Sequence, residues 1–222
     1  MLRTVAFVAA LAAGTLPGVA LANLLVNGDF DSGVEPWVDP FPDPGTTVSW
    51  SPIDSAGSPT SGSIQVETVI TNGAADGPWS ECIPAEPGPY TFSGQVFRPD
   101  SPALAWATLD LLFFPSPDCV GPYATATAFA NEVDVWEHVT LTGFAPLGTA
   151  ALRARVLVGG TSDTIPDVAR FDRLVLTAPE PGAGSLAAAA ALALAAAARV
   201  RRRAAAPPRW PWRAPRRAGS SS

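Results

Sequence analysis

Hydrophobic and polar residues alternate in short segments through the middle of the chain, and Pro, Gly, Asp and Ser separate these segments. Side chains two residues apart share one face of a β-strand, so the alternation predicts strands. The predicted strands are Leu24 to Val26, Thr46 to Trp50, Ser63 to Thr68, Pro78 to Ile83, Tyr90 to Arg98, Leu104 to Phe114, Ala124 to Phe129, His138 to Phe144, Ala151 to Val158 and Ala169 to Leu176. Ten short strands without helical periodicity predict an all-β fold, a jelly-roll β-sandwich, in one domain without internal repeats.

The alternation also predicts which side chains face outward. From Ala105 to Phe113 the odd positions are apolar, which places Trp106 and Asp110 on the outer face of their strand. An outward Trp beside acids, amides and arginines suits a sugar, whose C–H face stacks on the ring while its hydroxyls bond the polar groups. The predicted ligand-binding residues are Trp106, Asp110, Gln95, Trp50, Trp79, Arg153 and Arg155.

These aromatic residues also have a structural interpretation. A Trp on a sheet surface can lie under a loop or a neighbouring sheet, and polar outward residues occur on any solvated sheet face. Tyr123, in a loop with Pro and Gly, leaves the same two alternatives open. Trp37 and Trp136 are predicted to close the core at strand ends, and His138 is predicted to be an ordinary surface residue.

Charge divides the 222 residues into two unlike parts. The segment from Asn23 to Pro181 holds five arginines against twenty acidic residues, a formal charge of −15, whereas the part after Ala198 carries eight arginines and no acid. An acidic body repels phosphate backbones, which excludes nucleic acid as its partner. One His in the chain and no nucleophile elbow, phosphate-binding loop or zinc motif indicate that the protein is not an enzyme.

The two cysteines, Cys82 and Cys119, predict one structural disulfide in an exported protein. A disulfide that closes the loop between Cys82 and Cys119 is expected to stabilise the fold by about 4 kcal/mol, because it lowers the conformational entropy of the unfolded chain. Met1 to Ala22 has a basic start, an apolar stretch and a small-x-small end at Ala20-Leu21-Ala22, which together predict a secretory signal peptide. A buried N-terminal helix is the alternative, although Gly14, Pro17 and Gly18 interrupt it.

The C-terminal part contains a short motif, an apolar run and a basic cluster, in that order. These are Pro179-Glu180-Pro181, the predicted transmembrane helix Ala183 to Ala198, and Arg199, Arg201, Arg202 and Arg203. Residues 178–203 resemble the PEP-CTERM sorting signal of Gram-negative bacteria, which implies export to the cell envelope, with signal peptidase, an exosortase-type transpeptidase and the membrane as partners. An Ala-rich linker to a basic tail that binds membrane or nucleic acid is the alternative. Residues 204–222 are a Pro/Arg/Trp tail predicted to be disordered.

The predicted mature chain starts at Asn23, and soon afterwards comes Asn27-Gly28-Asp29-Phe30-Asp31, followed by Trp37. Later come Pro87-Gly88-Pro89-Tyr90, a strand entered through Trp136, and a closing Arg170-Phe171-Asp172-Arg173. Together these segments resemble the jelly-roll carbohydrate-binding modules of secreted glycanases, of the cellulose-binding CenC type, over residues 23–177.

The resemblance implies a structural calcium ion between the first and last strands. Asp31 and Asp172 match the acids of the family, and carbonyl oxygens near Gly28 are further hard ligands. It also implies non-catalytic binding of a polysaccharide or other glycan. A structural or adhesive matrix protein without a discrete sugar site is the alternative function.

Overall fold

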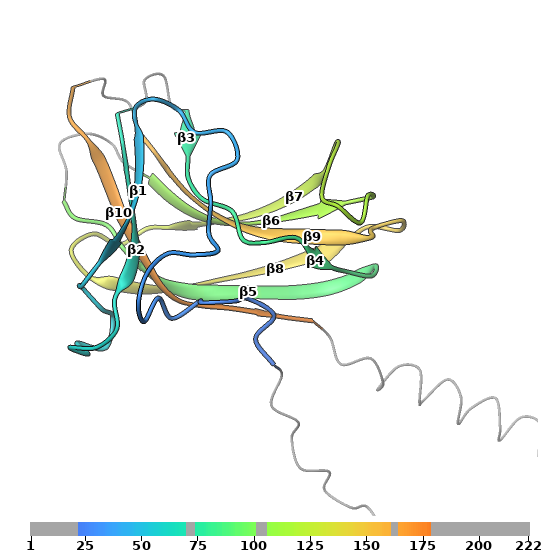
Figure 1. The fold of residues 1–222 in the computed structure, drawn as a ribbon, viewed down its shortest axis with the longest axis horizontal. Helices are drawn as coiled ribbons and strands as arrows, with labels where there is room; N and C mark the ends of the chain where they lie inside the picture. The colour runs from blue at the N-terminus through green and yellow to red at the C-terminus, as the bar shows by residue number, and fades with distance from the viewer. Residues whose placement is uncertain (1–21, 70–73, 101–105, 161–163, 179–222) are drawn as a thin grey trace, which may run out of the picture. The chain divides into compact units, whose positions relative to one another are not determined.

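The computed structural model describes residues 22–69, 74–100, 106–160 and 164–178, which form a sandwich of two antiparallel β-sheets (Figure 1). One sheet, called here the β10 sheet, has the strand order β1-β2-β10-β5-β8; the other, the β6 sheet, has the order β3-β9-β6-β7, with β4 also paired to β9. The strands are β1 (Thr46–Ser51), β2 (Ser63–Thr68), β3 (Ala75–Asp76), β4 (Ile83–Pro84), β5 (Gly88–Phe97), β6 (Trp106–Phe114), β7 (Ala124–Ala130), β8 (Trp136–Ala145), β9 (Ala151–Gly159) and β10 (Asp167–Thr177). The described residues contain no helix and form two antiparallel sheets, which confirms the predicted all-β sandwich.

The core lies between the two sheets and follows the predicted alternation. In β5 and β8, every second residue is buried and its neighbours are more exposed. Phe92 and Phe171 from the β10 sheet and Leu109 from the β6 sheet have no exposed surface. Burying a side chain of this size contributes about 2 kcal/mol or more, which makes this shared apolar layer the main source of stability.

Strand β6 departs from the alternation, because all its residues from Ala107 to Phe114 are buried. Its outer side chains Leu112 and Phe114 pack into a second apolar cluster with Trp79, Cys119 and Ala151. Chain segments outside the sandwich therefore cover this sheet face, as expected for a strand with a nearly continuous apolar sequence.

Two predicted strands are not formed as expected. In the segment Pro78 to Ile83, Trp79 forms an isolated bridge to Arg155 of β9, and Ile83 begins the two-residue strand β4, which also pairs with β9. Proline has no backbone N–H for a ladder, so Pro78 limits pairing here. The segment Leu24 to Val26 is not a strand, although the Leu24 N–H donates to the Leu176 carbonyl at 2.8 Å.

The opening turn attaches the start of the domain to β10. Asn27 and Phe30 have positive φ angles, and the Leu174 N–H donates to the Gly28 carbonyl at 2.9 Å. A Cβ at Gly28 would collide with the Leu174 carbonyl oxygen, which explains the glycine. Phe30 is fully buried beside Trp37, whose predicted role as a core residue is confirmed.

The predicted disulfide between Cys82 and Cys119 is formed. It joins the start of β4 to the loop before β7, and both cysteines pack beside Trp79. The bond therefore fixes the segments that cover the outer face of the β6 sheet.

Candidate functional site

The outer face of the β6 sheet gathers most of the predicted ligand-binding residues. On β9, Arg155 lies opposite Asp110 of β6 in the ladder, and it also forms the bridge with Trp79. Because both pairings are fixed by backbone register, the three side chains meet on one face. The predicted residues on this face are Trp79, Trp106, Asp110, Arg153 and Arg155.

Trp79 is the centre of this group. Its ring lies 5.8 Å from the Arg153 guanidinium carbon and 5.3 Å from that of Arg155, both within cation–π range. The Arg155 Nη2 and Nε atoms donate to Asp110 Oδ2 at 2.6 and 3.1 Å. The prediction that Asp110 is open to a ligand is wrong, because it is 2% exposed and paired with Arg155 beneath the covering segments.

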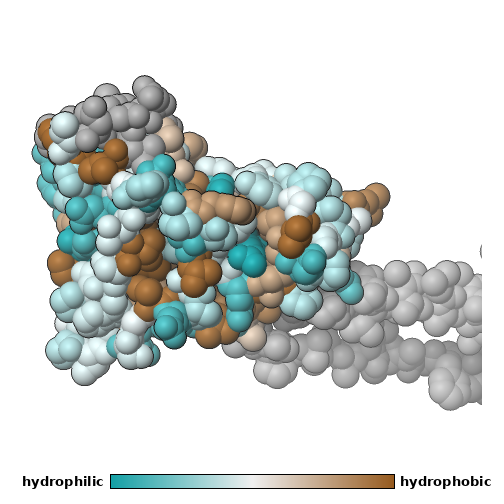
Figure 2. Space-filling view, turned by 45° about the horizontal axis from the view of Figure 1, so that its top comes forward, coloured by the Kyte–Doolittle hydropathy of each residue, from teal (hydrophilic) through white to brown (hydrophobic). Residues whose placement is uncertain are grey.

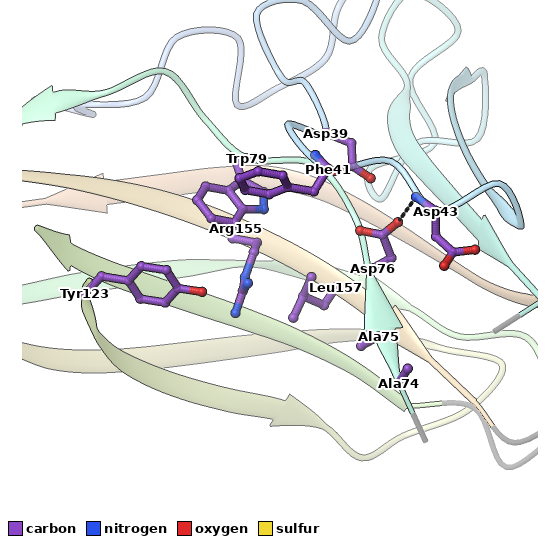
Figure 3. A pocket seen from close by; sticks show the side chains of 10 residues that line it. All are labelled: Asp39, Phe41, Asp43, Ala74, Ala75, Asp76, Trp79, Tyr123, Arg155 and Leu157. Atoms are coloured by element: carbon purple, nitrogen blue, oxygen red, sulfur yellow. Dashed lines mark hydrogen bonds between the residues drawn. The ribbon is translucent and has the colours of Figure 1, made fainter. Parts of the chain in front are cut away.

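A pocket of about 330 Å³ lies above this group (Figure 3). Trp79 is only 8% exposed, whereas Phe41 and Tyr123 are 75% and 43% exposed. Both rings meet Trp79 edge-on, at centroid distances of 5.9 and 6.1 Å. Trp79 therefore supports two accessible rings and is not itself an open platform. The lining residues are Asp39, Phe41, Asp43, Ala74, Ala75, Asp76, Trp79, Tyr123, Arg155 and Leu157.

The carboxylates of Asp39, Asp43 and Asp76 lie across the pocket from Tyr123 (Figure 3). The Asp43 N–H donates to Asp76 Oδ2 at 2.9 Å, which ties the two loops together. Asp39 Oδ2 is buried, and no group among the described residues donates a hydrogen bond to it. Burial first, and then the neighbouring Asp76 and Asp43 carboxylates, raise the pKa of Asp39 to about 6.

Protonation of Asp39 is expected to stabilise the fold as the pH falls from 7 to 5. With its pKa raised from 3.8 to about 6, the folded protein takes up this proton before the unfolded chain does. Thermal unfolding at pH 5, 6 and 7 measures the effect. Burial also raises the pKa of Asp167, so the comparison with Asp39→Asn isolates the Asp39 contribution. A variant whose melting temperature keeps the wild-type pH dependence would contradict the assignment.

Five of the seven predicted ligand residues do not line this pocket: Asp110 and Arg153, described above, and Trp106, Trp50 and Gln95. Trp106 is on the same sheet face but packs against Phe129, at a centroid distance of 5.8 Å, and over Gly159. Trp50 is 41% exposed on edge strand β1, and its Nε1 donates to the Phe30 carbonyl at 2.7 Å. Gln95 lies on the β10 sheet, so its predicted placement beside Trp106 is wrong: alternation gives a face but not the sheet.

Trp136 does not close the core as predicted. It is partly exposed at the start of β8 and packs against Phe97 at a centroid distance of 5.5 Å. His138 is exposed, as predicted, and lies 3.5 Å from the Gln95 amide nitrogen.

The described residues contain no group of three or more His, Cys, Asp or Glu side chains able to hold a metal ion. Asp172 is buried and its carboxylate accepts the Ser55 and Arg173 N–H groups, whereas Asp31 is exposed. The Gly28 carbonyl accepts the Leu174 N–H. These partners already satisfy Asp172 without a cation, so the arrangement does not require calcium, and calcium at Asp31, Asp172 and Gly28 stays a prediction.

The acids and the Phe41 ring of the pocket were not predicted from the sequence. Asp39, Phe41 and Asp43 alternate with prolines in one loop, which gives no strand pattern, and Asp76 ends the two-residue strand β3. The sequence signal that could have indicated this part of the pocket is Phe41, an aromatic residue with a proline and then an acid on each side. Figure 2 shows hydrophobic and hydrophilic residues intermingled over this side of the molecule.

No family model and no curated protein matches the chain. A structure described as Family 16 Carbohydrate Binding Module-2 has 19% identity and a TM-score of 0.48, covering 70% of this chain and 100% of that one. The CBM22-1–GH10 modules of the Clostridium thermocellum endo-1,4-β-D-xylanase 10B, complexed with xylohexaose, have 16% identity and a TM-score of 0.49, covering 70% and 28%.

The enzymatically active domain of bacteriophage CBA120 tailspike protein 4 has 17% identity and a TM-score of 0.50, covering 70% of this chain and 21% of that one. The chain thus spans under a third of the xylanase and tailspike chains. At this identity the tailspike likeness shows the fold alone, a β-sandwich.

The predicted signal peptide, sorting signal and tail lie outside the described residues, apart from Ala22 and Ala178. Within residues 22–69, 74–100, 106–160 and 164–178, no helix is long and apolar enough to cross a membrane.

Proposed function

We propose that this domain binds a glycan, without catalysis, in the pocket formed by Phe41, Tyr123 and the neighbouring carboxylates. The pairing of accessible rings with hydrogen-bonding groups in one pocket carries the proposal. Sugar C–H groups pack on aromatic faces, and carboxylates and guanidinium groups bond hydroxyls. Further support comes from two solved structures of similar fold: one is described as a carbohydrate-binding module, and the other contains such a module in a xylanase complexed with xylohexaose.

We further propose, from the sequence, that the protein is exported and displayed at the cell envelope through its C-terminal segment. The support is the order of Pro179-Glu180-Pro181, the apolar run and the arginines from Arg199 to Arg203. Replacing the four arginines of this cluster should impair surface retention. In this location a glycan-binding domain would meet envelope or environmental polysaccharides.

Glycan binding is expected to depend on the two accessible rings. Phe41→Ala and Tyr123→Ala should each weaken affinity about tenfold, since loss of one aromatic contact costs about 1.4 kcal/mol. The measurement is a glycan array, followed by titration of the intact, oxidised protein with the best oligosaccharide, with and without calcium. Ile53→Ala is the control, because Ile53 is 46% exposed between β1 and β2 and does not line the pocket.

Affinity that survives both ring substitutions would place the sugar elsewhere. A wild-type protein that binds no glycan in either condition would favour the structural matrix alternative. Trp106→Ala adds a comparison: lost binding with an unchanged melting temperature would extend the site along β6, while lost stability would assign Trp106 a packing role.

A further inference from the structure

The outer face of the β10 sheet carries a row of flat side chains across four adjacent strands. Gln65 of β2 lies opposite Arg170 of β10, Arg170 opposite Phe97 of β5, and Phe97 opposite Trp136 of β8. Four strands spaced about 4.8 Å apart make this row roughly 14 Å long. We call these four residues the Phe97 row.

Neighbouring members of the row are in contact. Arg170 Nε donates to Gln65 Oε1 at 2.9 Å, and the Arg170 guanidinium carbon lies 5.6 Å from the centre of the Phe97 ring. Phe97 and Trp136 follow at 5.5 Å. All four are partly exposed, so the row is held in place while it remains accessible to a ligand.

Beside the Phe97 row, the same face presents uncharged hydrogen-bonding groups. Gln95 lies opposite His138, and the next outward pairs along β5 and β8 are Ser93 with Thr140 and Thr91 with Thr142. His138, Thr140 and Thr142 are exposed. This strip along β5 and β8 carries hydroxyls, an amide and an imidazole on a domain segment whose formal charge is otherwise strongly negative.

The chemistry of this face selects among possible partners. Its rings are flanked by amide, guanidinium and hydroxyl groups, so it does not offer the apolar centre of a stable protein interface. The acidic body opposes nucleic acids and anionic polymers. A neutral, hydroxyl-rich chain, by contrast, can stack on the Phe97 row and bond the adjacent polar groups.

We propose that the outer face of the β10 sheet is a second glycan-binding surface, which takes a neutral polysaccharide chain. This inference rests on the proposed function of the first pocket. The two sheets expose their outer faces in opposite directions, with β5 and β8 on one side of the sandwich and β6 and β9 on the other (Figure 1). One domain can therefore connect two polysaccharide chains.

The test compares binding with cross-linking for intact protein mixed with neutral soluble polymers: hydroxyethyl cellulose, galactan, arabinoxylan and galactomannan. Affinity electrophoresis measures binding, and turbidity and viscosity measure cross-linking. Thr140→Arg places a bulky cation on the exposed strip, and Trp136→Ala removes the end of the row. Both should keep electrophoretic retardation within about twofold of wild type and lower cross-linking at least fivefold. Leu147→Arg is the control, since Leu147 is 95% exposed in the loop between β8 and β9.

The outcomes separate the two proposals. Retardation without cross-linking by the wild type, or full cross-linking by Thr140→Arg, overturns the second surface and leaves the first pocket standing. Retardation by none of the polymers contradicts the proposed function and this inference with it. Light scattering gives the oligomeric state: cross-linking that occurs only in a dimer broken by Thr140→Arg would assign the face to self-association and overturn the proposal.

Discussion

Replacing both cysteines, as Cys82→Ala with Cys119→Ala, is expected to lower the free energy of unfolding by about 4 kcal/mol. The disulfide joins residues 37 apart in sequence and so restricts the unfolded chain. It also lies in the apolar cluster with Trp79, Leu112 and Phe114. Denaturant unfolding of the oxidised protein and the double variant measures the difference.

The same variant is expected to weaken glycan binding. Cys119 precedes Tyr123 in one loop, and Tyr123 packs on both Trp79 and Phe114. Without the bond, this loop is no longer fixed to β4, so the accessible ring of the pocket loses its position. Wild-type protein reduced under native conditions is the control for the substitutions themselves. A double variant with wild-type stability and affinity would show that the apolar packing alone holds the loop.

The residues that could be predicted from sequence are those whose neighbours are fixed by strand geometry. Alternation placed Leu109 in the core, and the two cysteines predicted the disulfide. The alternation also placed Asp110 and Arg155 on the outer side of their strands, where the pairing of β6 with β9 brings them together.

The residues that could not be predicted depend on segments folding back from a distance. Nothing local to β6 indicates that Trp79 and the Cys119 loop cover its outer face, which is why Asp110 is buried and not a ligand contact. The pocket itself is closed by the loop with Phe41, which lies outside any periodic segment. Alternation likewise cannot tell that Gln95 and Trp106 belong to different sheets.

The second large effect is expected from Asp110→Ala, which should destabilise the fold by about 3 kcal/mol. Asp110 is 2% exposed, and the Arg155 side chain is 16% exposed. Removing one partner of such a pair leaves a largely buried charge without compensation, and this costs more than the pair itself contributes. Because Arg155 lines the pocket and stacks on Trp79, the affinity for the glycan should fall as well.

The control for this prediction replaces both members of the pair. Asp110→Leu with Arg155→Met removes the charges together and fills similar volumes, so it should recover most of the lost stability. Its glycan affinity should stay low, because the Arg155 guanidinium is absent from the pocket. Denaturant unfolding and oligosaccharide titration of the single and double variants separate the two roles. If Asp110→Ala alone left stability within 0.5 kcal/mol of wild type, about the size of an exposed pair, the ion pair would be a surface contact and the covering segments would not exclude water from it.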